Sequence, residues 1–140
     1  MEVTANAIQT VTPNSNIIFT ETAVKGNCSI LVREGSGLVT LRGLATQQCR
    51  ARFQITFNAN VAISEGGTLG PISVALAING EGVGPTTMIS TPAAVGDFNN
   101  ISSSVYIDVP TGCCYTVSVK SLTTTDIDVQ NANLIIERVA

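Results

Sequence analysis

Residues 52–61 read RFQITFNANV, and this stretch decides the fold. Apolar and polar side chains alternate along it without a break, which is the period of a β-strand with one face in a core and the other in water. The apolar set is Phe53, Ile55, Phe57, Ala59 and Val61. The stretch therefore predicts a long strand that the rest of the chain pairs with and covers.

Other segments of the chain show the same kind of pattern, separated by turns rich in Gly, Pro and Asn. No segment has a helical period over three turns, so we expect very little helix. About ten short strands spaced in this way predict an all-β, antiparallel jelly-roll sandwich. The predicted strands are 7–11, 16–24, 28–33, 38–42, 52–61, 72–79, 86–90, 101–109, 114–122 and 127–139.

The composition supports one compact domain over residues 1–140. Hydrophobic residues make up 44% of the chain, so the supply of core residues is ample. Charged residues make up only 12%, about half the usual share. Because so little charge leaves apolar surface to be covered, the simplest expectation is that copies of the chain associate with one another.

Several classes of function are disfavoured by what the sequence lacks. The seven Lys and Arg form no run and the net charge is −3, so a nucleic-acid-binding surface is not expected. No segment approaches the length of a membrane helix. The first residues, MEVTANAIQTVTPN, do not resemble a signal peptide, so we expect a soluble protein made in the cytoplasm and not exported.

Catalysis is also disfavoured, because the chain has no histidine and the serine and cysteine triads that depend on one are excluded. We expect no enzyme activity, no cofactor and no metal site. The residues Asp126 and Asp128 stand two apart and could share a calcium ion, but solvated charges at a turn are the favoured interpretation.

The four cysteines allow two interpretations. Cys28 and Cys49 flank a predicted hairpin and could form a disulfide, although small buried side chains on strands are favoured in a reducing compartment. A strained disulfide between the adjacent Cys113 and Cys114 is a further, less favoured possibility.

The last predicted strand is apolar on both faces at Leu134, Ile135 and Ile136. Such a strand is central in a sheet or buried at a subunit contact. On the strand 52–61, the polar face begins with Arg52, which could be ordinary solvated decoration. Alternatively, it could pair with Glu137 or Asp108 of a neighbouring subunit.

Most of the chain resembles small virion structural proteins of phages and prophages of Gram-positive gut bacteria. The segments that carry the resemblance are IIFTET (17–22), REGSGLVTLRG (33–43), CRARFQITFNANVAI (49–63), IDVPTGCCYTVSV (107–119) and VQNANLIIERVA (129–140). The architecture is also similar to the tumour-necrosis-factor/C1q-like class of ten-stranded jelly rolls, which form trimers with the last strand near the subunit contact.

The resemblance implies a homotrimer on the virion surface, either a capsid decoration protein or the head of a short fibre. Its partners would be itself and the major capsid protein or another virion protein. On this resemblance, the candidate residues of the trimer contact are Leu134, Ile135, Ile136, Arg52 and Glu137. The candidate capsid-facing part is an extended N-terminal arm over residues 1–13, with Val3, Ile8 and Val11.

An alternative function stays open beside that one. A surface adhesion module, or a receptor-binding or glycan-binding head of a fibre or spore-coat protein, would use the same trimer with exposed loops as its binding site. The shortage of aromatic residues, 4% with no Trp, weakens the glycan-binding version because sugars commonly stack on aromatic rings.

Overall fold

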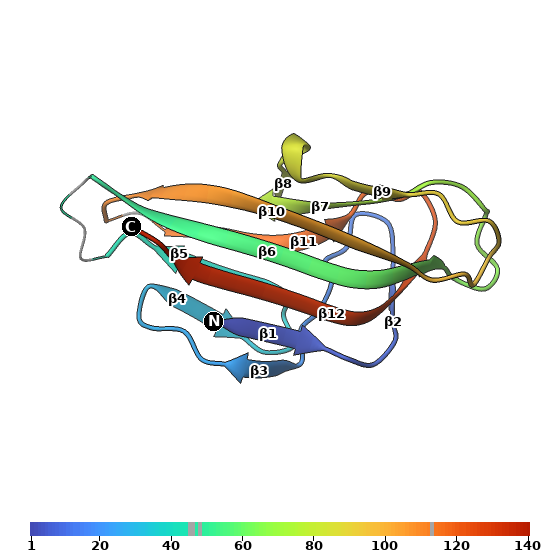
Figure 1. Ribbon diagram of the computed structural model, residues 1–140, viewed down its shortest axis with the longest axis horizontal. Helices are drawn as coiled ribbons and strands as arrows, with labels where there is room; N and C mark the ends of the chain where they lie inside the picture. Colours follow the sequence, from blue (N-terminus) through green and yellow to red (C-terminus); the bar gives the residue numbers. More distant parts are fainter. Residues whose placement is uncertain (45–46, 48, 113) are drawn as a thin grey trace.

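The computed structural model describes residues 1–44, 47, 49–112 and 114–140, which form two antiparallel sheets packed face to face (Figure 1). In the first sheet the strand order is β10 (Asn99–Pro110), β6 (Arg50–Ile63), β12 (Ile127–Arg138), β1 (Glu2–Ala5) and β3 (Glu21–Val24), with β2 (Gln9–Val11) also pairing with β12. In the second sheet the order is β4 (Ile30–Arg33), β5 (Leu38–Arg42), β11 (Cys114–Ser121), β7 (Ile72–Ile78) and β8 (Glu81–Gly82), with β9 (Met88–Ser90) pairing with β7.

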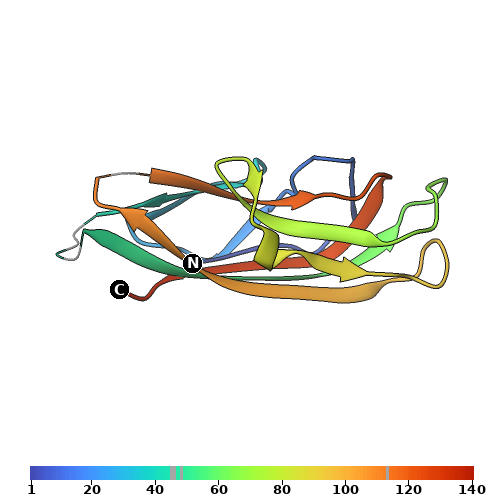
Figure 2. The same ribbon diagram turned by 90° about the horizontal axis from the view of Figure 1, so that it is seen from above.

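The described part of the chain contains one 3-10 turn, η1 (Gly84–Thr86), and no α-helix. No helix in it is long and apolar enough to cross a membrane. Figure 2 shows the flattened, elongated shape, with β6, β10 and β12 running along the length of the molecule.

The stretch 52–61 lies in β6 and has the predicted role. Every apolar residue predicted to face inward on it is buried, and Phe57 meets Phe19 edge-to-face with ring centroids 6.3 Å apart. β6 pairs with β10 on one side and β12 on the other, so its hydrogen-bonding groups are used along most of its length. Buried residues of the second sheet pack against the inward face of β6 and complete the core; they include Val39, Leu41, Val74, Leu76, Val117 and Val119.

The last strand is central, as its apolar pattern predicted. β12 lies between β6 and β1, and Leu134 and Ile136 are fully buried in the core. Its register with β6 shifts between Gln130 and Asn133. Asn131 occupies that bulge with φ of 57°, a left-handed conformation that asparagine tolerates better than most residues.

The N-terminal segment is part of the first sheet, so the extended arm predicted over residues 1–13 does not project from the domain. β1 pairs with both β12 and β3, and Val3 and Val11 point into the core with 1% and 3% of their surface exposed. Ile8, between the two strands, is exposed. The physical reason is that β12 is buried and its second edge needs a partner, which β1 and β2 supply.

The predicted strand over 16–24 is only partly a strand, because here the chain crosses from one sheet to the other. The Ile17 amide donates to the Val119 carbonyl of the second sheet at 2.8 Å, whereas Thr20 donates to Thr4 of the first at 3.0 Å. Only Glu21–Val24 forms β3.

The favoured interpretation of Cys28 and Cys49 as small buried side chains is wrong, because both are exposed. Both are free thiols in this structure, and a disulfide between them in an oxidising environment stays a prediction. Both lie in connections outside the strands, because β4 begins after Cys28 and β6 begins after Cys49. The suggested Cys113–Cys114 bridge involves a residue that lies outside the described residues.

Candidate functional site

The outer face of the first sheet has an uncharged area built from three long strands. Because β6 pairs residue by residue with β10 and β12, outward side chains line up across the sheet, for example Ser104 beside Thr56 beside Ile135. We call this area the uncharged face. It consists of Asn100, Ser102, Ser104 and Tyr106 from β10, Gln54, Thr56, Asn58 and Asn60 from β6, and Gln130, Asn133 and Ile135 from β12.

A row of asparagine side chains crosses one end of the uncharged face. Asn100 donates to the Asn60 carboxamide oxygen at 3.2 Å, and Asn60 donates to that of Asn131 at 3.0 Å. Asn131 in turn donates to Asn6 at 2.6 Å. Within the row the two inner amides, Asn60 and Asn131, both donate and accept, whereas Asn100 donates and Asn6 accepts. The row therefore links four chain segments and leaves hydrogen-bonding capacity toward solvent.

Two acids border the middle of this area. Glu2 of β1 lies opposite Ile135 and accepts a hydrogen bond from Asn133 at 2.5 Å. Glu137 is exposed in register with Gln54.

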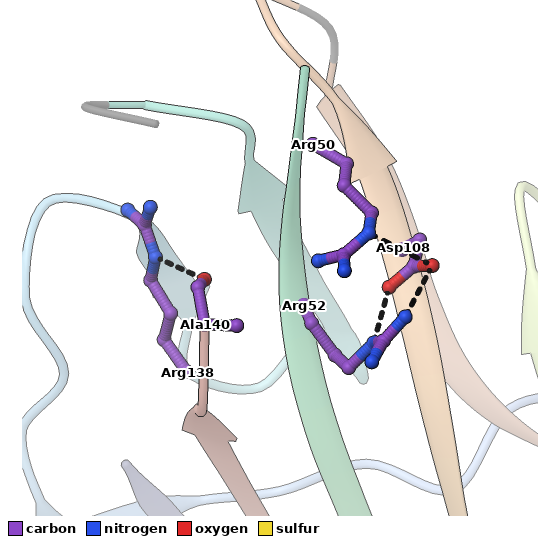
Figure 3. Close-up of polar contacts among 5 residues, drawn as sticks. All are labelled: Arg50, Arg52, Asp108, Arg138 and Ala140. Atoms are coloured by element: carbon purple, nitrogen blue, oxygen red, sulfur yellow. Dashed lines mark hydrogen bonds and ion pairs between the residues drawn. The ribbon is translucent and has the colours of Figure 1, made fainter. Parts of the chain in front are cut away.

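A cluster of charges lies beyond Tyr106, at the other end of the face. Arg52 donates two hydrogen bonds to Asp108 of the neighbouring strand, from Nε to Oδ1 at 2.8 Å and from Nη2 to Oδ2 at 3.1 Å (Figure 3). Arg50 lies 3.5 Å from the same carboxylate. Hydrogen bonding to Arg52 lowers the pKa of Asp108, helped by the charges of Arg52 and Arg50 and opposed by partial desolvation.

This ion pair corrects the prediction for Arg52. Its carboxylate partner, Asp108, belongs to the same chain, because antiparallel pairing places the two residues directly opposite each other. Glu137 lies on the outer face and is exposed, in register with Gln54. Glu137 remains a candidate for a subunit contact.

Of the three apolar residues predicted for a subunit contact on the last strand, only one is available for it. Leu134 and Ile136 are buried within their own protomer, so they cannot form a subunit contact and that part of the prediction is wrong. Ile135 points the other way, with 39% of its surface exposed near the centre of the uncharged face. Successive residues of a strand face opposite sides, and the run of three apolar residues hides that division.

A shallow cavity of about 410 Å³ lies at the charged end of this face. It is lined by Arg52, Tyr106, Asp108, Val139 and Ala140. The tail after β12 forms one wall: the Val139 amide donates to the Arg52 carbonyl at 2.9 Å, and Arg138 Nε donates to the Ala140 oxygen at 3.0 Å (Figure 3). An exposed tyrosine ring thus stands beside a fixed donor and acceptor pair.

Sequence reasoning did not single out this cavity or the asparagine row. The alternation over 101–109 places Tyr106 and Asp108 on one face, but only the register of β10 against β6 shows that this face meets Arg52. Among the described residues, no three His, Cys, Asp or Glu side chains gather in a way that could hold a metal ion.

Comparison with known proteins shows the fold. No family model matches the sequence, and no curated protein sequence matches it significantly. Among solved structures, the chain is similar to the globular domain of zebrafish complement 1qA, with a TM-score of 0.63 and 11% identity over 96% of this chain and 93% of that one.

It is also similar to the tumour necrosis factor Eiger from S. frugiperda, with a TM-score of 0.69 and 8% identity over 100% of this chain and 92% of that one. A third, weaker similarity is to the C-terminal domain of EclA, described as a sugar-binding protein. Its TM-score is 0.45, with 16% identity over 95% of this chain and 79% of that one. The predicted all-β jelly roll of the C1q and tumour-necrosis-factor type is therefore confirmed.

Proposed function

We propose that this protein is a homotrimeric structural protein whose subunits meet through the uncharged face, and that it serves on a phage virion as a capsid decoration or head-fibre protein. The observation that carries the trimer is the uncharged face itself. An exposed sheet in a monomer is normally studded with Lys and Glu, which discourage association. Here the outward side chains of the uncharged face are amides, hydroxyls, one isoleucine and one tyrosine, and acids, Glu2 and Glu137, stand only at its border.

Such a face suits contact between identical copies. In a cyclic trimer the same residues from three subunits converge near the axis, so charged groups there would repel their own copies. Amide and hydroxyl groups donate and accept at once, and therefore a residue can pair with its own counterpart. Ile135 supplies an apolar group within the same area.

The virion assignment rests on the resemblance carried by segments such as IIFTET and REGSGLVTLRG, with the low charge of the chain as support. A decoration protein binds the assembled lattice better than its dissociated parts and stabilises it by mass action. The partners are then the protein itself and the major capsid protein or another virion protein. We propose a binding role without enzyme activity or cofactor, located on the capsid surface after synthesis in the host cytoplasm.

Light scattering on a sizing column tests the trimer directly. A mass of about three times the 14.5 kDa chain supports the proposal. A monomer at all concentrations up to about 100 µM would overturn it, because a contact that weak could not hold a structural trimer together.

A second candidate is the glycan-binding or receptor-binding head of a fibre or spore-coat protein. The cavity at Tyr106 favours it, because a ring beside fixed donors and acceptors is the chemistry that holds a sugar; in this candidate the Tyr106 end of the uncharged face stays outside the subunit contact. Titration with mono- and oligosaccharides, followed by NMR shifts of the residues lining the cavity, tests this candidate. Tyr106→Ala should abolish any binding that is found, and binding that survives the substitution would place the sugar elsewhere.

A further inference from the structure

Three turns lie together at one end of the sandwich, the end away from the C-terminus (Figures 1 and 2). They are residues 64–71 between β6 and β7, 91–98 between β9 and β10, and 122–126 between β11 and β12. We call this surface the loop end. It lies at the opposite end of the first sheet from Arg52 and Asp108.

One hydrogen bond joins two of the turns, and others tie the turns to the strands. The Ser64 amide donates to the Asp126 carbonyl at 3.2 Å, and the Gly96 amide donates to the Ile63 carbonyl at 3.1 Å. The Leu122 amide donates to the Ser73 carbonyl at 2.8 Å. Because these bonds already fix the turns, a partner that binds here has little ordering to impose on them.

The loop end exposes large apolar side chains from all three turns. Each of the four has at least 40% of its surface exposed, namely Leu69, Val95, Phe98 and Leu122. Scattered single apolar residues are ordinary on a protein surface, but several on adjoining turns of one end mark an interaction surface.

The three turns of the loop end carry charge of one sign, and the nearest cation, Lys120 of β11, donates to the Gly80 carbonyl at 3.3 Å. The exposed charged residues of the turns are Glu65, Asp97 and Asp126. No Lys or Arg occurs between Arg52 and Lys120, or between Lys120 and Arg138, so none of the three turns contains a base. Arg50, Arg52 and Arg138 lie at the other end, because β6 begins and β12 ends there.

We propose that the loop end is the surface with which this protein docks onto its larger protein partner, and that the partner presents apolar side chains surrounded by Lys and Arg. The charge complementarity selects this occupant. A nucleic acid or an anionic membrane would be repelled by three exposed carboxylates, whereas a basic protein surface pairs with them and covers the apolar residues between them.

The inference rests on the proposed function, since it names the contact through which the decoration protein holds the capsid. It replaces the N-terminal segment as the capsid-facing part, because Val3 and Val11 are buried in the core. In a trimer the three loop ends are equivalent, and three modest contacts made together bind far more tightly than one.

The test uses assembled capsid shells of the phage that encodes this chain, prepared without the protein, and measures binding by co-sedimentation. The double variant Glu65→Lys/Asp97→Lys and the variant Phe98→Ser should each weaken binding at least about tenfold. Higher salt should weaken binding of the wild type, as expected for paired surface charges.

Matched controls carry the same changes away from the loop end. Glu21→Lys/Glu81→Lys alters exposed acids on β3 and β8, and Leu31→Ser alters an exposed apolar residue on β4. Both should change affinity less than about twofold. Thermal unfolding of every variant checks that the fold is intact.

The outcomes separate the two proposals. If the wild type does not bind the shells, the virion function is overturned and the inference falls with it. If the wild type binds and the loop-end variants bind as well as their controls do, the function stands and the docking surface lies elsewhere.

Discussion

At the scale of single residues, the direction of each side chain decides its role. Leu134, Ile135 and Ile136 are chemically alike, yet the outer two fill the core and the middle one faces outward. Arg52 and Asp108 are 56 positions apart in sequence but lie directly opposite each other on the adjacent strands β6 and β10. Neither the direction of Ile135 nor the pairing of Arg52 with Asp108 can be read from residue type alone.

The burial of Leu134 gives a prediction about stability. Leu134→Ala should lower the free energy of unfolding by about 2–5 kcal/mol, because it leaves a cavity among core residues. The matched change Leu31→Ala, at an exposed position on β4, should cost less than about 1 kcal/mol. Urea unfolding followed by circular dichroism at one protein concentration measures both, and equal losses would contradict the assignment of Leu134 to the core.

The ion pair at Asp108 gives a prediction about pH. Because its folded pKa is lowered from 3.8, Asp108 stabilises the fold above its unfolded pKa, and this contribution disappears as the pH falls through the folded value. Asp108→Asn should therefore be less stable than the wild type at pH 7, and the difference should shrink as the pH falls through the folded pKa of Asp108.

Urea midpoints of both proteins at pH 7 and at a series of successively lower pH values test the effect of Asp108. Glu137→Gln, on the same face, serves as the control and should show a smaller difference at pH 7. A difference for Asp108→Asn that stays unchanged down to the lowest pH at which both proteins fold would show that its origin is not the ionised carboxylate.

At the scale of elements, turns and sheet crossings shape the molecule. The hairpin of β4 and β5 turns through Gly35 and Gly37, with φ of 81° and 70°, a left-handed conformation that glycine adopts without strain. The two glycines differ in surroundings. A β-carbon on Gly35 would meet nothing within 4 Å, whereas one on Gly37 would lie 2.6 Å from the Ile17 carbonyl oxygen, where the chain crosses between the sheets.

That difference predicts unequal costs for the same substitution. Gly35→Ala should lower stability by about 1 kcal/mol, the cost of a left-handed conformation for a residue with a β-carbon. Gly37→Ala should cost at least about 2 kcal/mol, because the new methyl group also displaces the crossing segment. Thermal or urea unfolding of the two variants measures the difference in stability between them. Equal losses would mean that the crossing segment moves aside freely.

At the scale of the whole molecule, the uncharged face and the loop end are separate surfaces. Subunit contact through the first leaves the second free to dock, because one lies along the broad face of a sheet and the other at its end (Figure 1). The proposed function therefore assigns self-association and partner binding to different residues.

This separation predicts the behaviour of a charge placed on the uncharged face. Ile135→Asp should raise the dissociation constant of the trimer at least about tenfold, because three carboxylates would be brought together and desolvated. Leu31→Asp, equally exposed on the second sheet, should leave the mass unchanged. Light scattering over a dilution series gives the result, and an unaltered trimer in Ile135→Asp would move the contact to another surface.

The sequence by itself determined the fold class, the long strand over 52–61, the central last strand and the glycine turns. These depend on alternation and turn chemistry, which act between neighbours in the chain. The tertiary structure alone decided that residues 1–13 join the sheet, that Arg52 pairs within its own chain, and that three distant turns meet at one end. The reason is physical: strand order and register are set by contacts between residues far apart in sequence, and a single strand's pattern is the same whichever partner lies beside it.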